Sequence, residues 1–123
     1  MHMKHLYTWQ FADVVCAFIK KYNEKNRFCT TTICHVEQID HDTFAFVRRL
    51  ENTMSSKPLY ERIVVNRKDQ SLKGYTFESP TSDIYSEHYV YQADGPKTQY
   101  DMYLLRSPGL QRYLRGTLHD WGV

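Results

Sequence analysis

The stretch TFAFVRRLE, residues 43–51, decides how this chain folds, because its side chains alternate as they do along an extended strand. Every second side chain from Phe44 to Leu50 falls on one face of that strand. The preceding segment, residues 28–39, carries a β-branched run and is separated from it by a short Asp-His-Asp turn. The two segments together predict an antiparallel hairpin.

The same pattern repeats further along the chain. Alternating segments at 60–66 and 71–78 flank one polar turn, and segments at 84–92 and 98–106 flank another. Each connection is too short for a crossover, so neighbouring strands must run antiparallel. We therefore expect two further hairpins and a meander of about six strands.

Two stretches outside the strands repeat their apolar residues at helical spacing. Thr8 is placed to cap the first stretch, and Ser107-Pro108 is a typical start for the second. The apolar stripes are Phe11, Val14, Val15, Phe18, Ile19 and Tyr22, then Leu110, Tyr113, Leu114, Thr117, Leu118 and Trp121. We expect helices over residues 9–22 and 108–121.

These elements predict an α+β fold of the helix-grip class, in which an antiparallel sheet of about six strands is flanked by an N-terminal and a C-terminal helix. A chain of 123 residues suits one domain over 1–123 with one core. Both helical stripes must face something apolar. The residues expected in that core are Phe11, Val15, Phe18, Leu114, Leu118 and Trp121.

Composition and charge exclude several classes of protein. The formal net charge of +2 is too small to argue for nucleic acid, and no apolar stretch approaches the length of a transmembrane helix. Residues 1–7 contain no apolar or arginine-rich leader. Cys16, Cys29 and Cys34 include no Cys-x-x-Cys pair, which argues against a disulfide scaffold or a zinc ribbon. We expect Cys16 to be a small core residue.

Catalytic and metal-binding patterns are weak. Cys34 and His35 are neighbours on a strand, so their side chains point to opposite faces and cannot form a nucleophile–base pair without a bulge. Adding Cys29 and His41 gives no common zinc spacing. Two acids on separate strands, Glu61 and Glu87, could meet, but the sequence does not place them together. We expect no catalytic residue, no metal and no cofactor.

The pair Arg48-Arg49 carries more information. One arginine must face inward and the other outward, and Arg48 shares its face with apolar residues. At least one guanidinium should therefore meet an anion or a carboxylate. An ion pair with Glu51, Glu37 or a cross-strand acid is favoured over a ligand contact, and both alternatives stay open.

Five segments resemble, in order, the PRELI-like (slowmo-type) family of mitochondrial intermembrane-space phospholipid transfer proteins. They are FIKKY (18–22), the hairpin from Thr32 ending in VRRL (47–50), IVVNRKDQSLK (63–73), SEHYVY (86–91) and GLQRYL (109–114). The resemblance implies a START/PRELI-like helix-grip domain. It also implies that Lys21 and Arg49 contact the phosphate of a lipid headgroup, although both are equally well explained as surface or ion-pair residues.

The resemblance is to a shortened form of the family. Residues 51–59 are too few for the helix that serves the family as a lid, and the chain ends soon after the last helix begins. The segment YNEK, residues 22–25, lacks the family's prolines. Without a lid, acyl chains would lose shielding worth roughly 0.8 kcal/mol per methylene group.

We therefore expect a non-enzymatic accessory or structural subunit of a mitochondrial inner-membrane assembly, located in the intermembrane space or at the inner membrane. Its partners would be other protein subunits, with phospholipid as a further candidate. The alternative is an intermembrane-space carrier of phosphatidic acid or phosphatidylserine that works with a small helper protein. A small-ligand enzyme on the same fold is a weaker third possibility.

Overall fold

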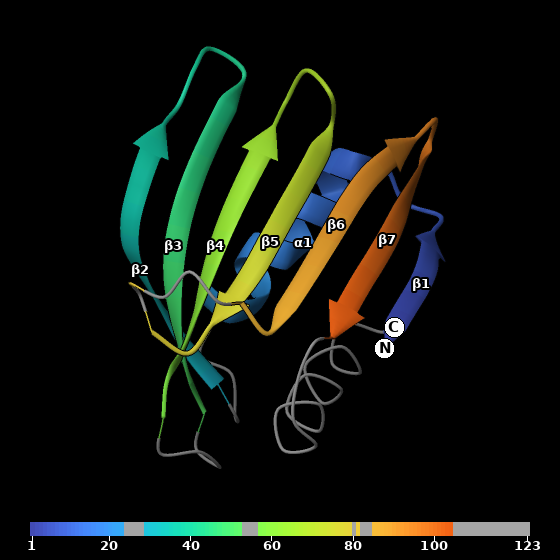
Figure 1. Ribbon diagram of the computed structural model, residues 1–123. Helices are drawn as coiled ribbons and strands as arrows, with labels where there is room; N and C mark the ends of the chain where they lie inside the picture. Colours follow the sequence, from blue (N-terminus) through green and yellow to red (C-terminus); the bar gives the residue numbers. More distant parts are fainter. Residues whose placement is uncertain (24–28, 53–56, 80, 82–84, 105–123) are drawn as a thin grey trace.

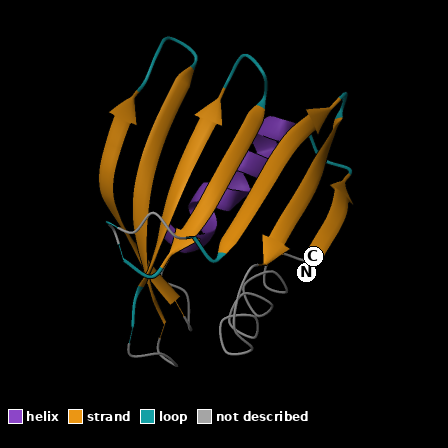
Figure 2. Cartoon of the chain, viewed as in Figure 1, coloured by secondary structure: helices purple, strands orange, loops and turns teal. Residues whose placement is uncertain are grey.

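The computed structural model describes residues 1–23, 29–52, 57–79, 81 and 85–104. Within these residues the chain forms one helix and a sheet of seven strands (Figures 1 and 2). In chain order the elements are β1 (His2–Tyr7), α1 (Phe11–Asn23), β2 (Cys29–Gln38), β3 (Thr43–Asn52), β4 (Leu59–Asn66), β5 (Ser71–Phe77), β6 (Glu87–Asp94) and β7 (Lys97–Leu104).

All neighbouring strands of the sheet are antiparallel, in the order β1-β7-β6-β5-β4-β3-β2. The hairpins β2–β3, β4–β5 and β6–β7 confirm the three hairpins predicted from alternation. β1 and β2 lie at opposite edges, and α1 carries the chain from one to the other behind the sheet (Figure 1). We call the face that α1 covers the inner face and the opposite one the outer face.

The predicted fold class is wrong. The described chain is dominated by the seven-stranded antiparallel sheet, and it begins with a strand instead of a helix. β1 pairs with β7 from His2↔Tyr103 to Tyr7↔Thr98, so α1 is internal and does not flank the sheet from the N-terminus. The sequence HMKHLY mixes polar and apolar residues on both faces, and its strand conformation follows from pairing with β7.

The helix expected at 108–121, with Leu114, Leu118 and Trp121, lies outside the described residues.

The first helix forms where its apolar stripe predicts it. The carbonyl of Gln10 accepts hydrogen bonds from the backbone of Asp13 and Val14, both at 3.1 Å, which closes the first turn. Phe11, Val14 and Phe18 are buried, while Val15 and Ile19 are half-buried against the core. Cys16 lies on the exposed side of α1, so its interpretation as a core residue is wrong.

The core lies between α1 and the inner face. The Phe18 ring packs 5.7 Å from the Tyr89 ring and 5.6 Å from the Tyr91 ring, measured between centroids. Gly74 makes room for this packing, because a Cβ atom there would lie 2.1 Å from Cζ of Tyr89. A side chain on residue 74 would therefore displace the Tyr89 ring. The other buried apolar side chains of the core are Phe46, Ile63, Val65, Leu72, Tyr100, Met102 and Leu104.

Candidate functional site

Four polar residues form a row across the inner face, which we call the inner polar row. They are register partners on β3 to β6: Arg48 faces Glu61, Glu61 faces Thr76, and Thr76 faces Glu87. Their exposed fractions are 1%, 5%, 2% and 4%. Strand alternation forces them inward, because each stands two residues from a buried neighbour on its own strand. Buried ionisable groups of this kind must be paired or neutral.

Arg48 is the cation of the row. Its Nε lies 3.4 Å from Oε1 of Glu61, and its Nη2 donates to Oε2 of the same carboxylate at 3.4 Å. Its Nη1 donates to the carbonyl of Phe18 at 3.2 Å, and its Cζ stands 4.2 Å from the centre of the Phe18 ring. The cross-strand acid is therefore the partner that Arg48 uses. The same contacts tie β3 and β4 to α1.

Tyr89 extends the cluster from the adjacent register position. Its hydroxyl donates a hydrogen bond to Oε2 of Glu61. Burial and the neighbouring Glu61 charge raise the pKa of Tyr89 well above its ordinary value, so the phenol stays protonated and remains a donor. Glu61 thus accepts from a guanidinium and a phenol inside an apolar shell.

Glu87 is the second acid of the row. Thr76 Oγ1 donates to Glu87 Oε2 at 3.0 Å. Burial first, and then the charge of Glu61, raise the pKa of Glu87 to about 8, against the lowering effect of the Thr76 hydrogen bond. At neutral pH the row therefore holds one ion pair and one uncharged carboxylic acid.

The edge strand β2 is the other unusual region. Ile33, Val36 and Ile39 at and after this strand are 45%, 67% and 53% exposed. β2 ends the strand order, so one of its sides faces no other strand of the described chain (Figure 1). A bulge between Ile33 and His35 leaves Cys34 without a register partner. Exposed β-branched residues on an open edge are typical of an interaction surface.

The predicted headgroup residues lie on different elements. Lys21 belongs to α1, and its side chain is outside the described part of the chain. Arg49 follows the inward Arg48 on β3 and so projects from the outer face, where its Nη2 lies 3.2 Å from Oε1 of Glu51. Glu51 is one of the acids expected for this arginine pair. The role of Lys21 and Arg49 as headgroup contacts stays a prediction.

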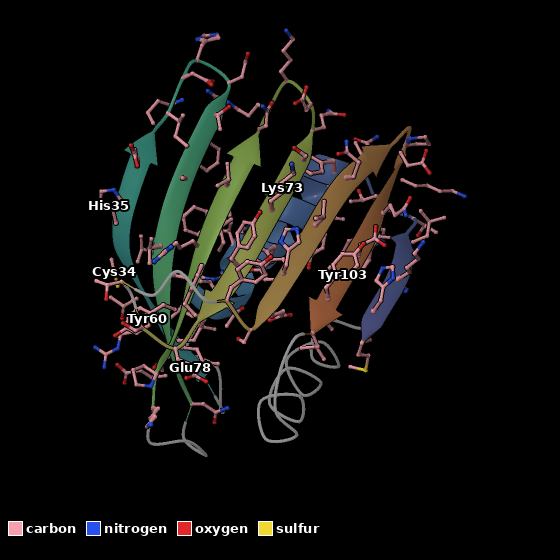
Figure 3. All side chains as sticks on the ribbon, in the orientation of Figure 1. Cys34, His35, Tyr60, Lys73, Glu78 and Tyr103 are labelled. Carbon is pink, nitrogen blue, oxygen red and sulfur yellow. The ribbon has the colours of Figure 1, made fainter. Side chains whose placement is uncertain are left out.

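Cys34 and His35 make separate contacts on the β2 edge (Figure 3). The Cys34 thiol donates to the carbonyl of Thr32 at 3.6 Å, and His35 Nε2 lies 3.8 Å from Glu37. Among the described residues no three His, Cys, Asp or Glu side chains gather as a metal site would require. No helix in the same residues has the length and apolarity that crossing a bilayer requires.

Sequence reasoning named Glu61 and Glu87 but could not join them. Their approach depends on the register of β4, β5 and β6, and Thr76 between them gave no signal of its own. The alternation of the strands carried one signal. It places the charged residues at 48, 61 and 87 on the same face as the buried apolar residues of their strands.

Comparison with known proteins adds the fold. No family model and no curated protein matches this sequence. The solution structure of the 18 kDa protein CC1736 from Caulobacter crescentus is similar, with a TM-score of 0.59 over 98% of this chain and 85% of that chain. The two sequences are 9% identical, so the likeness shows the fold alone.

Proposed function

We propose that this chain is a non-enzymatic accessory subunit that binds other subunits of a mitochondrial inner-membrane assembly through its β2 edge. The observation that carries the proposal is the exposure of Ile33, Val36 and Ile39 beside an open strand edge. Such an edge offers backbone donors and acceptors to an added strand of a partner. The exposed side chains supply apolar area for the partner to cover.

The positions of these side chains support an edge-wise partner. Ile33 pairs in register with Arg48, and Val36 pairs with Phe46, so both belong to the inner face. On that face the apolar surface continues from Val36 to Phe44, which is half-buried and packs 6.5 Å from the Phe46 ring. A partner strand beside β2 would both extend the sheet and cover the apolar surface formed by Ile33, Val36 and Phe44.

The interior supports a non-enzymatic role. Glu61 contacts both Arg48 and Tyr89, and each of the three residues is at least nine-tenths buried. A catalytic acid or base must reach its substrate within hydrogen-bond distance. These groups instead join β3, β4 and β6 to the helix, which is a structural use of their charge.

The mitochondrial setting of the proposal rests on the PRELI-like resemblance of the sequence. The same resemblance carries the rival function, transfer of phosphatidic acid or phosphatidylserine with a helper protein. That rival serves as an outcome of the test.

The test compares two charge insertions on opposite edges of the sheet. Val36→Lys places a charge on the β2 edge, and Leu6→Lys places one on β1 at a residue that is 46% exposed. The tagged full chain is isolated from mitochondrial membranes in mild detergent, and the mass of its complex is measured. We expect Val36→Lys to release the chain from its assembly and Leu6→Lys to leave the assembly intact.

Two results would overturn the proposal. One is an assembly that survives Val36→Lys as well as it survives Leu6→Lys. The other is movement of labelled phosphatidic acid between liposomes by the isolated chain above the spontaneous rate, which would promote the carrier.

A further inference from the structure

Four rings form a row across the outer face, which we call the outer ring row. His2, Tyr103, His88 and Tyr75 are successive register partners on β1, β7, β6 and β5. Their centroids are 4.3, 6.1 and 4.4 Å apart, with angles between ring planes of 12°, 14° and 14°. Figure 3 shows Tyr103 on the side of the sheet away from α1. The rings therefore stack on one another along the row.

Hydrogen bonds and a further ring hold this arrangement. His88 Nδ1 donates to the carbonyl of Gly74 at 3.0 Å, and His2 Nε2 donates to Asp101 Oδ1 at 3.0 Å. The Tyr85 ring meets Tyr75 edge-on at 5.1 Å and His88 at 6.2 Å. Both imidazoles are thus oriented by a bond as well as by stacking. The row is a preorganised surface.

Stacking decides which chemistry the row can bind. Tyr103 and His88, the two middle rings, have a neighbouring ring on each face, so they turn their edges to solvent, and Tyr103 remains 39% exposed. The edge of an aromatic ring carries partial positive charge, while its face is negative. Nucleobases bind proteins by stacking on free ring faces. The row therefore suits anionic oxygen atoms better than bases.

The charges beside the row have the same sign. Arg62 continues it on β4, where it pairs with Tyr75 and stands 4.0 Å over the Phe77 ring. Lys73 and Lys4 are exposed one outward position further along β5 and β1. One register row holds the rings and Arg62, and the next holds Lys73 and Lys4. The acid in these two rows is Asp101, which is bonded to His2 and to Gln99. Two exposed lysines, together with the Arg62 that already contacts the Phe77 ring, thus accompany one engaged carboxylate.

We propose that the outer ring row, with Arg62, Lys73 and Lys4, is a docking strip for an acidic extended segment of a partner protein. The inference rests on the proposed accessory function and names the chemistry of a partner at a second surface. The strip crosses five strands, which is roughly 19 Å at about 4.8 Å per strand. An extended segment of about six residues spans that length.

The test measures binding of a fluorescein-labelled twelve-residue peptide of alternating Glu and Ser by fluorescence anisotropy at low salt. Lys4→Glu/Lys73→Glu reverses two charges in the strip. Lys20→Glu/Lys68→Glu reverses two exposed charges elsewhere, on α1 and on the β4–β5 turn. We expect the first variant to weaken binding by about tenfold or more and the second by about twofold or less. Tyr103→Ser, which changes no charge, should also weaken binding severalfold.

Three results would overturn the docking strip: no binding of the acidic peptide by the wild-type chain, equal weakening by the two double variants, or retention of affinity in Tyr103→Ser. Tighter binding of phosphatidylserine vesicles than of the peptide, lost in Lys4→Glu/Lys73→Glu, would assign the strip to a membrane instead. Thermal unfolding of each variant shows that it is folded. If Val36→Lys disrupts the assembly but the wild-type chain does not bind the acidic peptide, this inference is wrong and the proposed function stands.

Discussion

Adjacent residues on the same strands build two different polar rows. Glu61, Thr76 and Glu87 stand on the inner face, and their sequence neighbours Arg62, Tyr75 and His88 stand on the outer face. The inner row closes on itself, with an ion pair and a neutral acid. The outer row lies on the opposite face of the sheet, where His2 and His88 bond to Asp101 and to the Gly74 carbonyl and where Lys4 and Lys73 are exposed. The two rows differ in their exposure to water more than in their residue types. Buried charges must be paired or neutralised locally, whereas charges on the outer face are solvated.

The largest effect should come from raising the pH. The folded-state pKa of Glu87, about 8, lies above the ordinary value of 4.5, so the folded chain holds a proton that the unfolded chain releases between these two values. The contribution of this retained proton to the free energy of unfolding is fully present below about pH 4.5, and it is lost as the pH rises through 8. The free energy of unfolding should fall by up to about 5 kcal/mol over that window.

Urea unfolding of the wild type and of Glu87→Gln between pH 5 and pH 9 checks this. The amide stays uncharged, so its stability should depend less on pH than that of the wild type. Glu37→Gln, at an exposed acid on β2, should keep the wild-type slope. Equal slopes for the wild type and Glu87→Gln would show that Glu87 is not the group responsible.

Breaking the inner ion pair should be the next largest change. Arg48→Met leaves the Glu61 carboxylate buried without its cation, which should cost about 3–5 kcal/mol. Arg62→Met on the outer face should cost about 1 kcal/mol or less, because that guanidinium is partly solvated. Urea denaturation compares the two. Recovery of most of the lost stability in Arg48→Met/Glu61→Leu would confirm that the stranded charge is the cause, and no recovery would contradict it.

Phe18 links α1 to the inner polar row through its ring and its carbonyl. Phe18→Ala should reduce the free energy of unfolding by about 3 kcal/mol, by removing a closely packed ring from the core. Phe18→Leu, which retains most of the apolar volume, should cost less than half of that. A loss under about 1 kcal/mol for Phe18→Ala would show that this part of α1 faces open space or a partner.

The smallest effect belongs to the outer ring row. Tyr103→Ser should cost about 0.5–1 kcal/mol, the usual size of a cross-strand aromatic contribution. If the loss reached that of Arg48→Met, the row would be a main support of the sheet, and its contrast with the inner row would disappear. Thermal unfolding at pH 7 suffices to compare the two variants.

Alternation was a sound guide to the strands from β2 to β7, and helical spacing was a sound guide to α1. It was no guide to β1, since HMKHLY becomes a strand only through β7, about a hundred residues later. The predicted fold class was wrong at the N-terminal end, because β1 was not predicted. With β1 in the sheet, α1 becomes an internal helix and does not flank the sheet. Parity predicted that at least one arginine of the Arg48-Arg49 pair meets an anion or a carboxylate, and both lie beside a glutamate. The choice of Glu61 required the β3–β4 register, which local sequence does not carry.

The placement of β1 has a consequence for the order in which the molecule is completed. The Met1 amino group donates to the carbonyl of Leu104 at 3.1 Å, so the sheet joins the two described strands that lie furthest apart in the sequence. During synthesis β1 must wait, unpaired, while the three hairpins assemble by local contacts. Contacts of such long sequence separation slow folding. We therefore expect β1 to join the sheet after the other described strands.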